Sequence, residues 1–169
     1  MTAPETESPE RATVELREVE GFLYREARFA DEHDYDAWEA LWTDDAIYWV
    51  PANGDEVDPS TQVSVVHDNR SRIRTRLAQL RTGKRHSQSP KSRLRRLLSN
   101  VELLGTDGGD TVVGANFVVY EARERGVTSW AGRVTYRLRR DEVGELRMAY
   151  KKVELVDNEF ALPSMSFLI

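Results

Sequence analysis

The chain has 169 residues, a formal net charge of −5 and no cysteine. This length suits one well-buried domain. Without thiols the chain can hold no disulfide, no nucleophilic cysteine, no thiolate zinc site and no iron–sulfur cluster of its own. An aromatic content of 9%, with four tryptophans, excludes a disordered chain, because these side chains supply the burial that offsets the entropy of ordering.

The first ten residues are mostly Pro, Glu, Thr and Ser, which leaves almost nothing to bury. We therefore expect a flexible tail over residues 1–10 and a single domain over residues 11–169. The acidic start lacks the basic and then apolar pattern of a secretory signal, and no apolar run approaches the ~20 residues of a membrane helix. The sequence predicts a cytoplasmic protein with no membrane partner.

Two helices are predicted at the start of the domain, the first from about residue 13 to residue 32. Its apolar residues at helical spacing are Val19, Phe22, Leu23, Ala27 and Ala30. Asp34 is the predicted N-cap of the second helix, because a short side-chain oxygen accepts from the free amides of a first turn. The buried face of that helix is predicted to contain Trp38, Leu41 and Trp42.

A short strand is predicted after these helices. Residues 43–45 are turn formers that break the second helix, and residues 46–50 are an apolar run rich in strand-forming side chains. Pro51 stops the strand, because it lacks the amide hydrogen that a sheet needs. Residues 52–61 have the composition of a loop.

A third helix is predicted over about residues 67–80, after a possible strand at residues 62–66. Thr82 and Gly83 end this helix, since glycine adopts the backbone conformation that follows a last turn at little cost. The rest of the chain changes to the alternating pattern of strands.

Four long strands follow, separated by glycine-containing turns. They are predicted at residues 97–104, 111–123, 128–140 and 145–156. In the third of them, Trp130, Val134, Tyr136 and Leu138 alternate with Arg133, Thr135, Arg137 and Arg139. This alternation is typical of a sheet with one buried face and one polar face. In the last strand the apolar parity changes, and we predict a bulge at Lys151 and Lys152.

Helices followed by an antiparallel meander predict the α+β class, with the helices packed on one face of a strongly curved sheet. Such a sheet forms a cone. Its concave side is either filled by side chains or left open as a pocket.

Charge is distributed unevenly along the chain. Residues 1–68 hold 18 acids and 4 bases, whereas residues 70–96 hold 11 bases and no acid. The basic block is consistent with pairing to the acidic first third of the chain, with contact to another subunit, or with nucleic-acid binding. No aromatic residue accompanies it to stack on bases, so we expect no nucleic-acid partner.

The sequence offers little for catalysis. Its three histidines, His33, His67 and His86, include no pair at the i, i+4 spacing of a helical metal site, and we expect no metal ligand among them. A pocket could hold an acid–base pair, either Tyr24 with Asp45 or Tyr48 with Asp68, for an isomerase or a dehydratase. Packing and turn formation explain the same residues equally well. A module that binds a ligand without chemistry is a further alternative.

Several stretches resemble, in order, the beta (small) subunits of Rieske-type aromatic-ring-hydroxylating dioxygenases. They are residues 22–28, 31–32, Trp38, 68–70, Arg76, Leu80, 82–83, Pro90, 92–93, Arg95, 97–100, 151–153 and 166–169. The stretch from Pro90 to Asn100 is similar to a Pro-Ser-Arg-x-Arg-x-Leu-x-Ser-Asn signature. The resemblance runs from about residue 19 to the last residue.

The resemblance implies an NTF2-like cone that assembles with a large alpha subunit, three of each around a threefold axis. The alpha subunit would carry a Rieske 2Fe–2S cluster and a mononuclear Fe(II), and electrons would arrive from NAD(P)H through a separate reductase. Together they would convert an aromatic substrate and O₂ to a cis-dihydrodiol. The chain itself would hold no cofactor and no catalytic residue, and it would be inactive alone.

Subunit contacts are the role that remains for the distinctive residues of the chain. Opposite charges on neighbouring patches set the register of a cyclic assembly. We predict that arginines of the basic block and the apolar end of the chain contact the alpha subunit or other beta subunits. The predicted residues are Arg70, Arg76, Arg93, Arg95, Arg96, Phe167, Leu168 and Ile169.

Overall fold

The computed structural model describes residues 13–84, 90–162 and 164–169. These ranges form three helices and six strands: α1 (Leu16–Asp31), α2 (Tyr35–Glu39), β1 (Trp42–Pro51), β2 (Ser64–Asn69), α3 (Arg70–Arg81), β3 (Arg93–Asp107), β4 (Asp110–Arg123), β5 (Gly126–Arg140) and β6 (Leu146–Leu155). The predicted tail over residues 1–10 and His86 lie outside the described residues. The division into a tail and one domain over residues 11–169 therefore stays a prediction.

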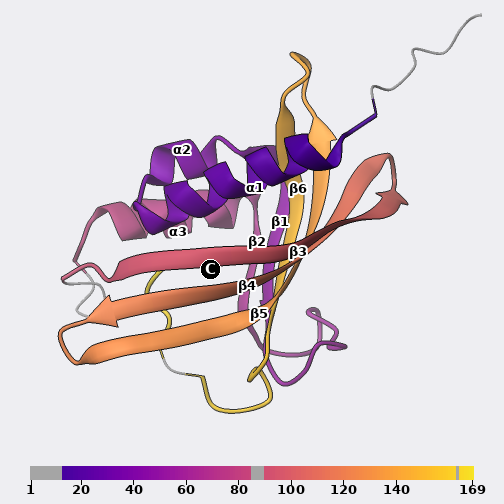
Figure 1. Ribbon diagram of the computed structural model, residues 1–169. Helices are drawn as coiled ribbons and strands as arrows, with labels where there is room; N and C mark the ends of the chain where they lie inside the picture. Colours follow the sequence, from indigo (N-terminus) through magenta and orange to yellow (C-terminus); the bar gives the residue numbers. More distant parts are fainter. Residues whose placement is uncertain (1–12, 85–89, 163) are drawn as a thin grey trace, which may run out of the picture.

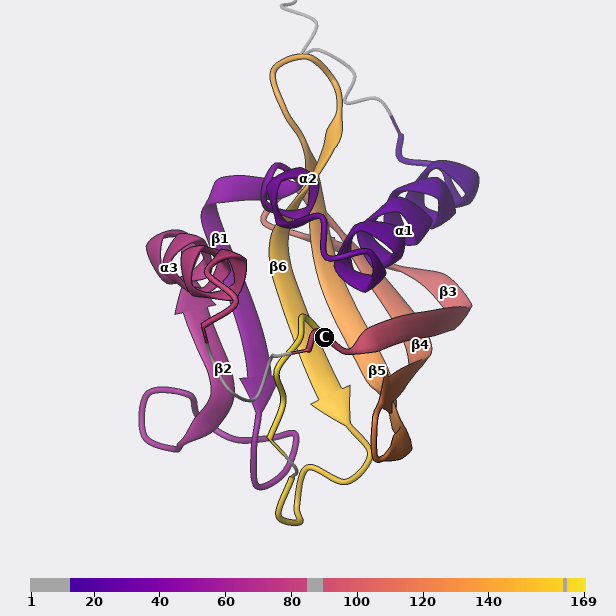
Figure 2. The same cartoon turned by 90° about the vertical axis from the view of Figure 1, so that its left-hand side faces the viewer.

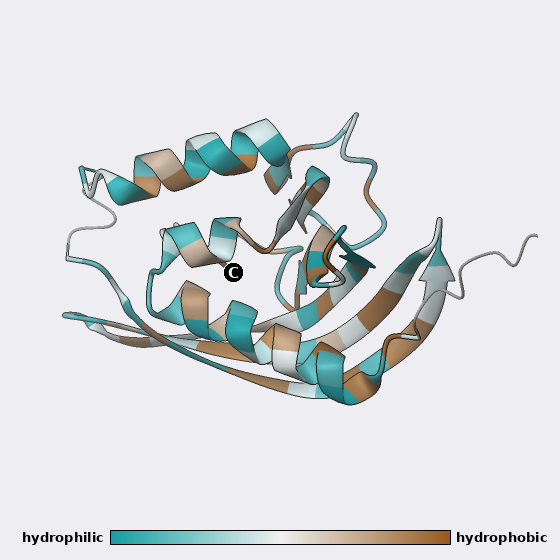
Figure 3. Ribbon diagram, turned by 90° about the horizontal axis from the view of Figure 1, so that it is seen from above, coloured by the Kyte–Doolittle hydropathy of each residue, from teal (hydrophilic) through white to brown (hydrophobic). Residues whose placement is uncertain are grey.

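The six strands form one mixed sheet in the order β2-β1-β6-β5-β4-β3. Strands β1 and β6 pair in parallel, and the other neighbours pair antiparallel. All three helices lie over the same face of the sheet (Figures 1 and 2), and the long strands curve around them (Figure 3). The predicted α+β cone with helices on one face of a curved sheet is confirmed.

The helix α1 packs its apolar stripe into the concave side of the sheet, as the spacing predicted. Val19, Phe22 and Leu23 are fully buried. The same stripe also buries two acids, Glu26 and Asp31. These acids require partners, because an unpaired charge in a dry interior is costly.

The helix α2 is shorter than predicted. Asp34 is its N-cap, with Oδ1 accepting from the Ala37 amide at 3.1 Å, but the helix ends at Glu39. Trp42 belongs to β1 and pairs with Met148 of β6, so the strand starts four residues before the predicted position 46. The backbone amide of Met148 also donates to the Leu41 carbonyl, 2.7 Å away. Pairing with a distant strand thus overrides the local helical spacing.

The helix α3 starts at Arg70 rather than at residue 67. Asn69 is its N-cap and accepts from the Arg72 amide at 3.0 Å. Residues 64–69 form β2 instead, antiparallel to β1. The predicted strand at residues 62–66 was therefore placed too early, and it continues up to the cap.

The bulge in β6 lies at Ala149, two residues before the predicted position. Leu138 pairs with Met148 and Arg137 pairs with Tyr150, which leaves Ala149 as the extra residue. A bulge re-aims the side chains that follow it. Lys151 is consequently turned into the cone, where it is only 1% exposed.

Candidate functional site

The interior of the cone contains a buried ion pair between α1 and β6. Lys151 Nζ lies 2.7 Å from Glu26 Oε1, and the two side chains are 2% and 1% exposed. Trp38 Nε1 donates to the same carboxylate oxygen at 2.7 Å. The ammonium group also lies 5.8 Å from the ring centroids of Trp38, Tyr48 and Tyr136. This is a cage of aromatic faces around a cation that already has its counter-ion.

The environment of Glu26 keeps it ionised. Burial alone would raise the pKa of this carboxyl group, but the charges of Lys151 and Arg96 and the hydrogen bonds from Lys151 and Trp38 outweigh burial and hold the pKa below its usual value. A general acid in this position would need the opposite shift. Glu26 is therefore a fixed anion that satisfies the cation beside it.

Two tyrosines inside the cone stay protonated at neutral pH. Burial raises the pKa of Tyr48 to about 12, and burial together with the charge of Glu26 raises that of Tyr136 well above its usual value. The Tyr136 hydroxyl lies 3.5 Å from Glu26 Oε2. Such hydroxyls donate hydrogen bonds but cannot serve as bases.

The last residues of the chain fill the remaining space between the helices and the sheet, where Figures 1 and 2 place the end of the chain. Phe167, Leu168 and Ile169 are all buried. The Tyr48 hydroxyl donates to the Ile169 carbonyl at 2.7 Å, and Arg96 Nη2 donates to the Leu168 carbonyl at 2.8 Å. The space in which an enzyme of this shape would place a substrate is thus occupied by the chain itself.

A second polar cluster closes the concave side where β3 begins. Glu121 accepts from the Ser92 hydroxyl at 2.5 Å, from Arg123 Nε at 2.7 Å and from Trp130 Nε1 at 3.1 Å. His33 Nε2 donates to the Ser92 carbonyl, and Tyr35 donates to His33 Nδ1. The cluster joins the α1–α2 turn to the sheet.

The proposed acid–base pairs do not form. Tyr24 is 54% exposed on α1, while Asp45 binds Thr43 and Arg139. Tyr48 and Asp68 face each other across β1 and β2. Their polar atoms go to other partners, the Asp68 carboxylate to Arg76 at 2.6 Å and the Tyr48 hydroxyl to Ile169.

Two general features were also sought. Among the described residues, no group of three or more His, Cys, Asp and Glu side chains could hold a metal ion. No helix within the described ranges is long and apolar enough to cross a membrane.

Most of the predicted interface residues make contacts within the chain. Arg70 pairs with Glu39, Arg76 with Asp68 and Arg96 with Asp31, at 3.0, 2.6 and 2.7 Å. Pairing with the acidic first third is therefore one role of the basic block. Phe167, Leu168 and Ile169 are covered by the cone. Arg93 and Arg95 are exposed on β3, and their contact with another subunit stays a prediction.

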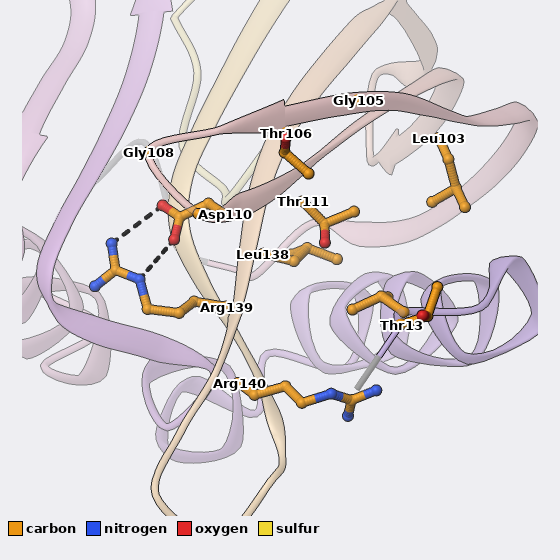
Figure 4. Close-up of a pocket in the computed structure, with 12 residues that line it drawn as sticks. Thr13, Leu103, Gly105, Thr106, Gly108, Asp110, Thr111, Leu138, Arg139 and Arg140 are labelled. Carbon is orange, nitrogen blue, oxygen red and sulfur yellow. Dashed lines mark hydrogen bonds and ion pairs between the residues drawn. The ribbon is translucent and has the colours of Figure 1, made fainter. Parts of the chain in front are cut away.

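The largest surface cleft, of about 780 Å³, lies between the segment before α1, the β3–β4 hairpin and the end of β5 (Figure 4). Arg139 binds Asp110 there through two hydrogen bonds of 2.6 and 3.1 Å. Arg140, which also lines the cleft, pairs with Glu18. The charged groups of the cleft are thus engaged with one another, and its other lining is largely apolar.

The residues that dominate the interior are ones that the sequence did not single out as a site. Glu26 lies in phase with Phe22 and Ala30 on the apolar stripe of α1, which is a signal that an acid is buried. Lys151 gave no such signal, because its orientation depends on where the bulge falls in β6. Glu121 sits at an inward position of β4, between the buried Val119 and outward-facing neighbours.

The chain matches the family model described as "Ring hydroxylating beta subunit" over residues 25–161. It is 34% identical over 143 residues to the small oxygenase component of a p-cumate 2,3-dioxygenase system of Pseudomonas putida, covering 83% of this chain and 79% of that protein. It is 29% identical over 153 residues to the beta subunit of toluate 1,2-dioxygenase of the same species, covering 88% and 93%.

Solved structures give the same result. The beta subunit of benzoate 1,2-dioxygenase from Burkholderia mallei superposes with a TM-score of 0.76 at 26% identity, covering 94% of this chain and 100% of that one. Naphthalene 1,2-dioxygenase superposes with a TM-score of 0.72 at 19% identity, covering 85% and 79%, and this likeness concerns the fold.

Proposed function

Because the chain belongs to the family of ring hydroxylating beta subunits, we propose that it is the structural beta subunit of an aromatic-ring-hydroxylating dioxygenase. The observation that carries this proposal is the filled interior of the cone. Buried ionisable groups there are bound to one another, and residues 167–169 occupy the remaining space. A chain built in this way contributes shape and contacts to an oxygenase.

The chemistry then belongs to the alpha subunit. The name of the p-cumate relative, a small oxygenase component, is consistent with a larger companion. That companion would carry the Rieske cluster and the mononuclear iron, and a separate reductase would deliver electrons from NAD(P)H. We place the assembly in the cytoplasm, where NAD(P)H is available, and we expect three beta subunits around a threefold axis.

The outward face of β3 is the surface that we propose for subunit contact. Arg95 lies directly across from Tyr120 of β4, and Leu97 lies two residues further along the same face. Tyr120 and Leu97 are 47% and 57% exposed, and Arg93 and Arg95 are exposed beside them. Arginine and tyrosine are enriched in the centres of protein interfaces. We call Arg93, Arg95, Leu97 and Tyr120 the β3 patch.

Charge reversal tests the β3 patch. The double variant Arg93→Glu/Arg95→Glu, co-expressed with its alpha subunit, should lose the complete assembly in light scattering, because an interface rejects buried charges of the wrong sign. The matched control is Arg17→Glu/Arg72→Glu, which changes the net charge equally at exposed positions on α1 and α3. Unchanged assembly of the first variant, or equal loss in both, would contradict the proposed surface.

Reconstitution tests the function as a whole. The purified chain should be inert alone, and its addition should raise the yield or the turnover of a co-expressed alpha subunit. Conversion of a small ketone by the isolated chain would instead identify an isomerase and refute the structural role.

A further inference from the structure

Residues 167–169, which we call the tail plug, contact the interior as a bound ligand would. The Phe167 ring stands edge-on to Trp130, with centroids 5.5 Å apart. The Leu168 and Ile169 carbonyl oxygens accept from Arg96 Nη2 and from the Tyr48 hydroxyl. The Ile169 amide donates back to the Tyr48 oxygen at 3.2 Å. The plug therefore offers one aromatic ring, carbonyl acceptors and an amide donor.

The groups that hold the tail plug are fixed by other parts of the fold. Arg96 is held by Asp31 of α1, which accepts from its Nε at 2.7 Å and from its backbone amide at 2.9 Å. Trp130 is held by its hydrogen bond to Glu121 of β4. Tyr48 lies on the central strand β1. A site whose walls are anchored independently of its occupant is preorganised for another occupant.

The connection between the tail plug and the sheet is irregular. Strand β6 ends at Leu155, and residues 156–162 and 164–169 contain neither helix nor strand. Withdrawal of the plug would therefore leave every strand pair of the sheet intact. Its cost would be the exposure of the plug and of the walls.

The charges of the walls select the kind of ligand. Arg96 already faces Asp31, and Lys151 already faces Glu26, so neither cation lacks a counter-ion. An additional buried anion would have no charge to balance it. A neutral acceptor meets the free donors of the walls without this penalty.

We propose that the space of the tail plug is a binding site for a small neutral aromatic amide. Its ring lies against Trp130 in the place of Phe167. Its carbonyl oxygen accepts from Tyr48 and Arg96, and its N–H donates to the Tyr48 oxygen. This site belongs to the beta chain alone and does not depend on the proposed function or on an alpha subunit.

The first test uses a chain that ends at Ser166, with benzamide as the probe. Millimolar benzamide should raise its melting temperature by ~5 °C, because a ligand that binds only the folded state stabilises it. The full chain should respond much less, since the tethered plug competes at a high effective concentration. Toluene, which has the ring without the amide, and benzoate, which carries a charge, should both bind more weakly.

A further substitution in the shortened chain tests the polar contact. Tyr48→Phe removes the hydroxyl and keeps the ring, so it should weaken benzamide binding about threefold to tenfold and leave toluene binding unchanged. A folded shortened chain that ignores benzamide, or a Tyr48→Phe variant that binds it equally well, would overturn the proposal.

A second variant keeps the proposal testable if the shortened chain does not fold. Phe167→Ala in the full chain opens only the space beside Trp130, and benzamide should raise the melting temperature of this variant but not of the unaltered chain. The matched control is Phe160→Ala, whose ring is 74% exposed outside the cone. An equal response of both variants, or none in Phe167→Ala, would refute the site.

Discussion

Glu26 and Lys151 each place a charge where the chain gives almost no access to water, and each is tolerable only because of the other. Removing two ions from water costs several kcal/mol, which their attraction repays when the geometry is good and the remaining valences are satisfied. Here Trp38 supplies a further donor to the carboxylate. The pair therefore contributes little net free energy but ties α1 to β6 in one register.

Deleting one partner of this pair should be far more damaging than deleting both. Lys151→Met leaves Glu26 uncompensated and is expected to lower the free energy of unfolding by about 3–5 kcal/mol. The double variant Glu26→Leu/Lys151→Met should recover most of that loss, because two apolar side chains of similar size suit the same space. Urea unfolding of the four chains of the cycle provides the measurement.

The neighbouring lysine provides the control for this cycle. Lys152 lies on the opposite face of β6, is 17% exposed, and pairs with Glu154 outside the cone. Lys152→Met should therefore change stability by less than about 1 kcal/mol. Equal effects of the two lysine substitutions would show that burial of Lys151 does not govern the energetics.

At the scale of single elements, Gly132 of β5 is required by the close approach of the chain beyond β6. A Cβ at this position would lie 2.1 Å from the Glu154 carbonyl oxygen and 3.0 Å from the Leu155 Cα. Both are backbone atoms of a paired strand, so they cannot move without breaking the ladder. The glycine allows β5 and β6 to stay in contact as the sheet bends.

Substitution of Gly132 by alanine should accordingly destabilise the fold by about 1–3 kcal/mol, seen as a lower melting temperature. Gly114 of β4 is the matched control. A Cβ there would meet the ends of the Arg133 and Leu104 side chains, which can turn away. We expect Gly114→Ala to cost less than about 1 kcal/mol. A larger loss for Gly114→Ala than for Gly132→Ala would contradict this account.

Periodicity in the sequence predicted those elements whose burial follows their own spacing. The helix α1 and the strand β5 are in this group, because each buries one face along its whole length. The first residues of β1 were missed, since Trp42 fits a helical face and a strand equally well, and only pairing with Met148 decides between them. Asn69 was available as a cap signal for α3, but the strand before it carries no strong alternation.

At the scale of the molecule, the uneven charge along the sequence becomes pairing in space. The acids of the first third meet the arginines of α3 and β3 through Glu39, Asp68 and Asp31. The sequence predicted this pairing as one of three explanations and could not name the partners. The parallel contact between β1 and β6, which brings Lys151 to Glu26, joins strands about a hundred residues apart and leaves no local signal.

This pairing has a consequence for stability in acid. The carboxyl groups whose pKa is lowered by hydrogen bonds and nearby cations include Glu18, Glu26, Glu39 and Asp45. Each binds its proton more weakly when folded than when unfolded. Each therefore adds stability above its unfolded pKa of roughly 4, and this stability is lost as the pH falls through the lower folded pKa.

The urea midpoint of the chain should consequently be nearly constant from pH 7 to about pH 5 and should fall steeply between about pH 5 and pH 3. In the Glu26→Leu/Lys151→Met variant the fall should be shallower, because one carboxyl group with a lowered pKa has been removed along with its partner. The exposed pairs, such as Glu18 with Arg140, should lose part of their effect in 1 M salt, whereas the buried pair should not, since ions screen only charges that reach water. A midpoint that stays level down to pH 3, or an equally steep fall in the double variant, would mean that these ion pairs do not distinguish the folded chain from the unfolded one.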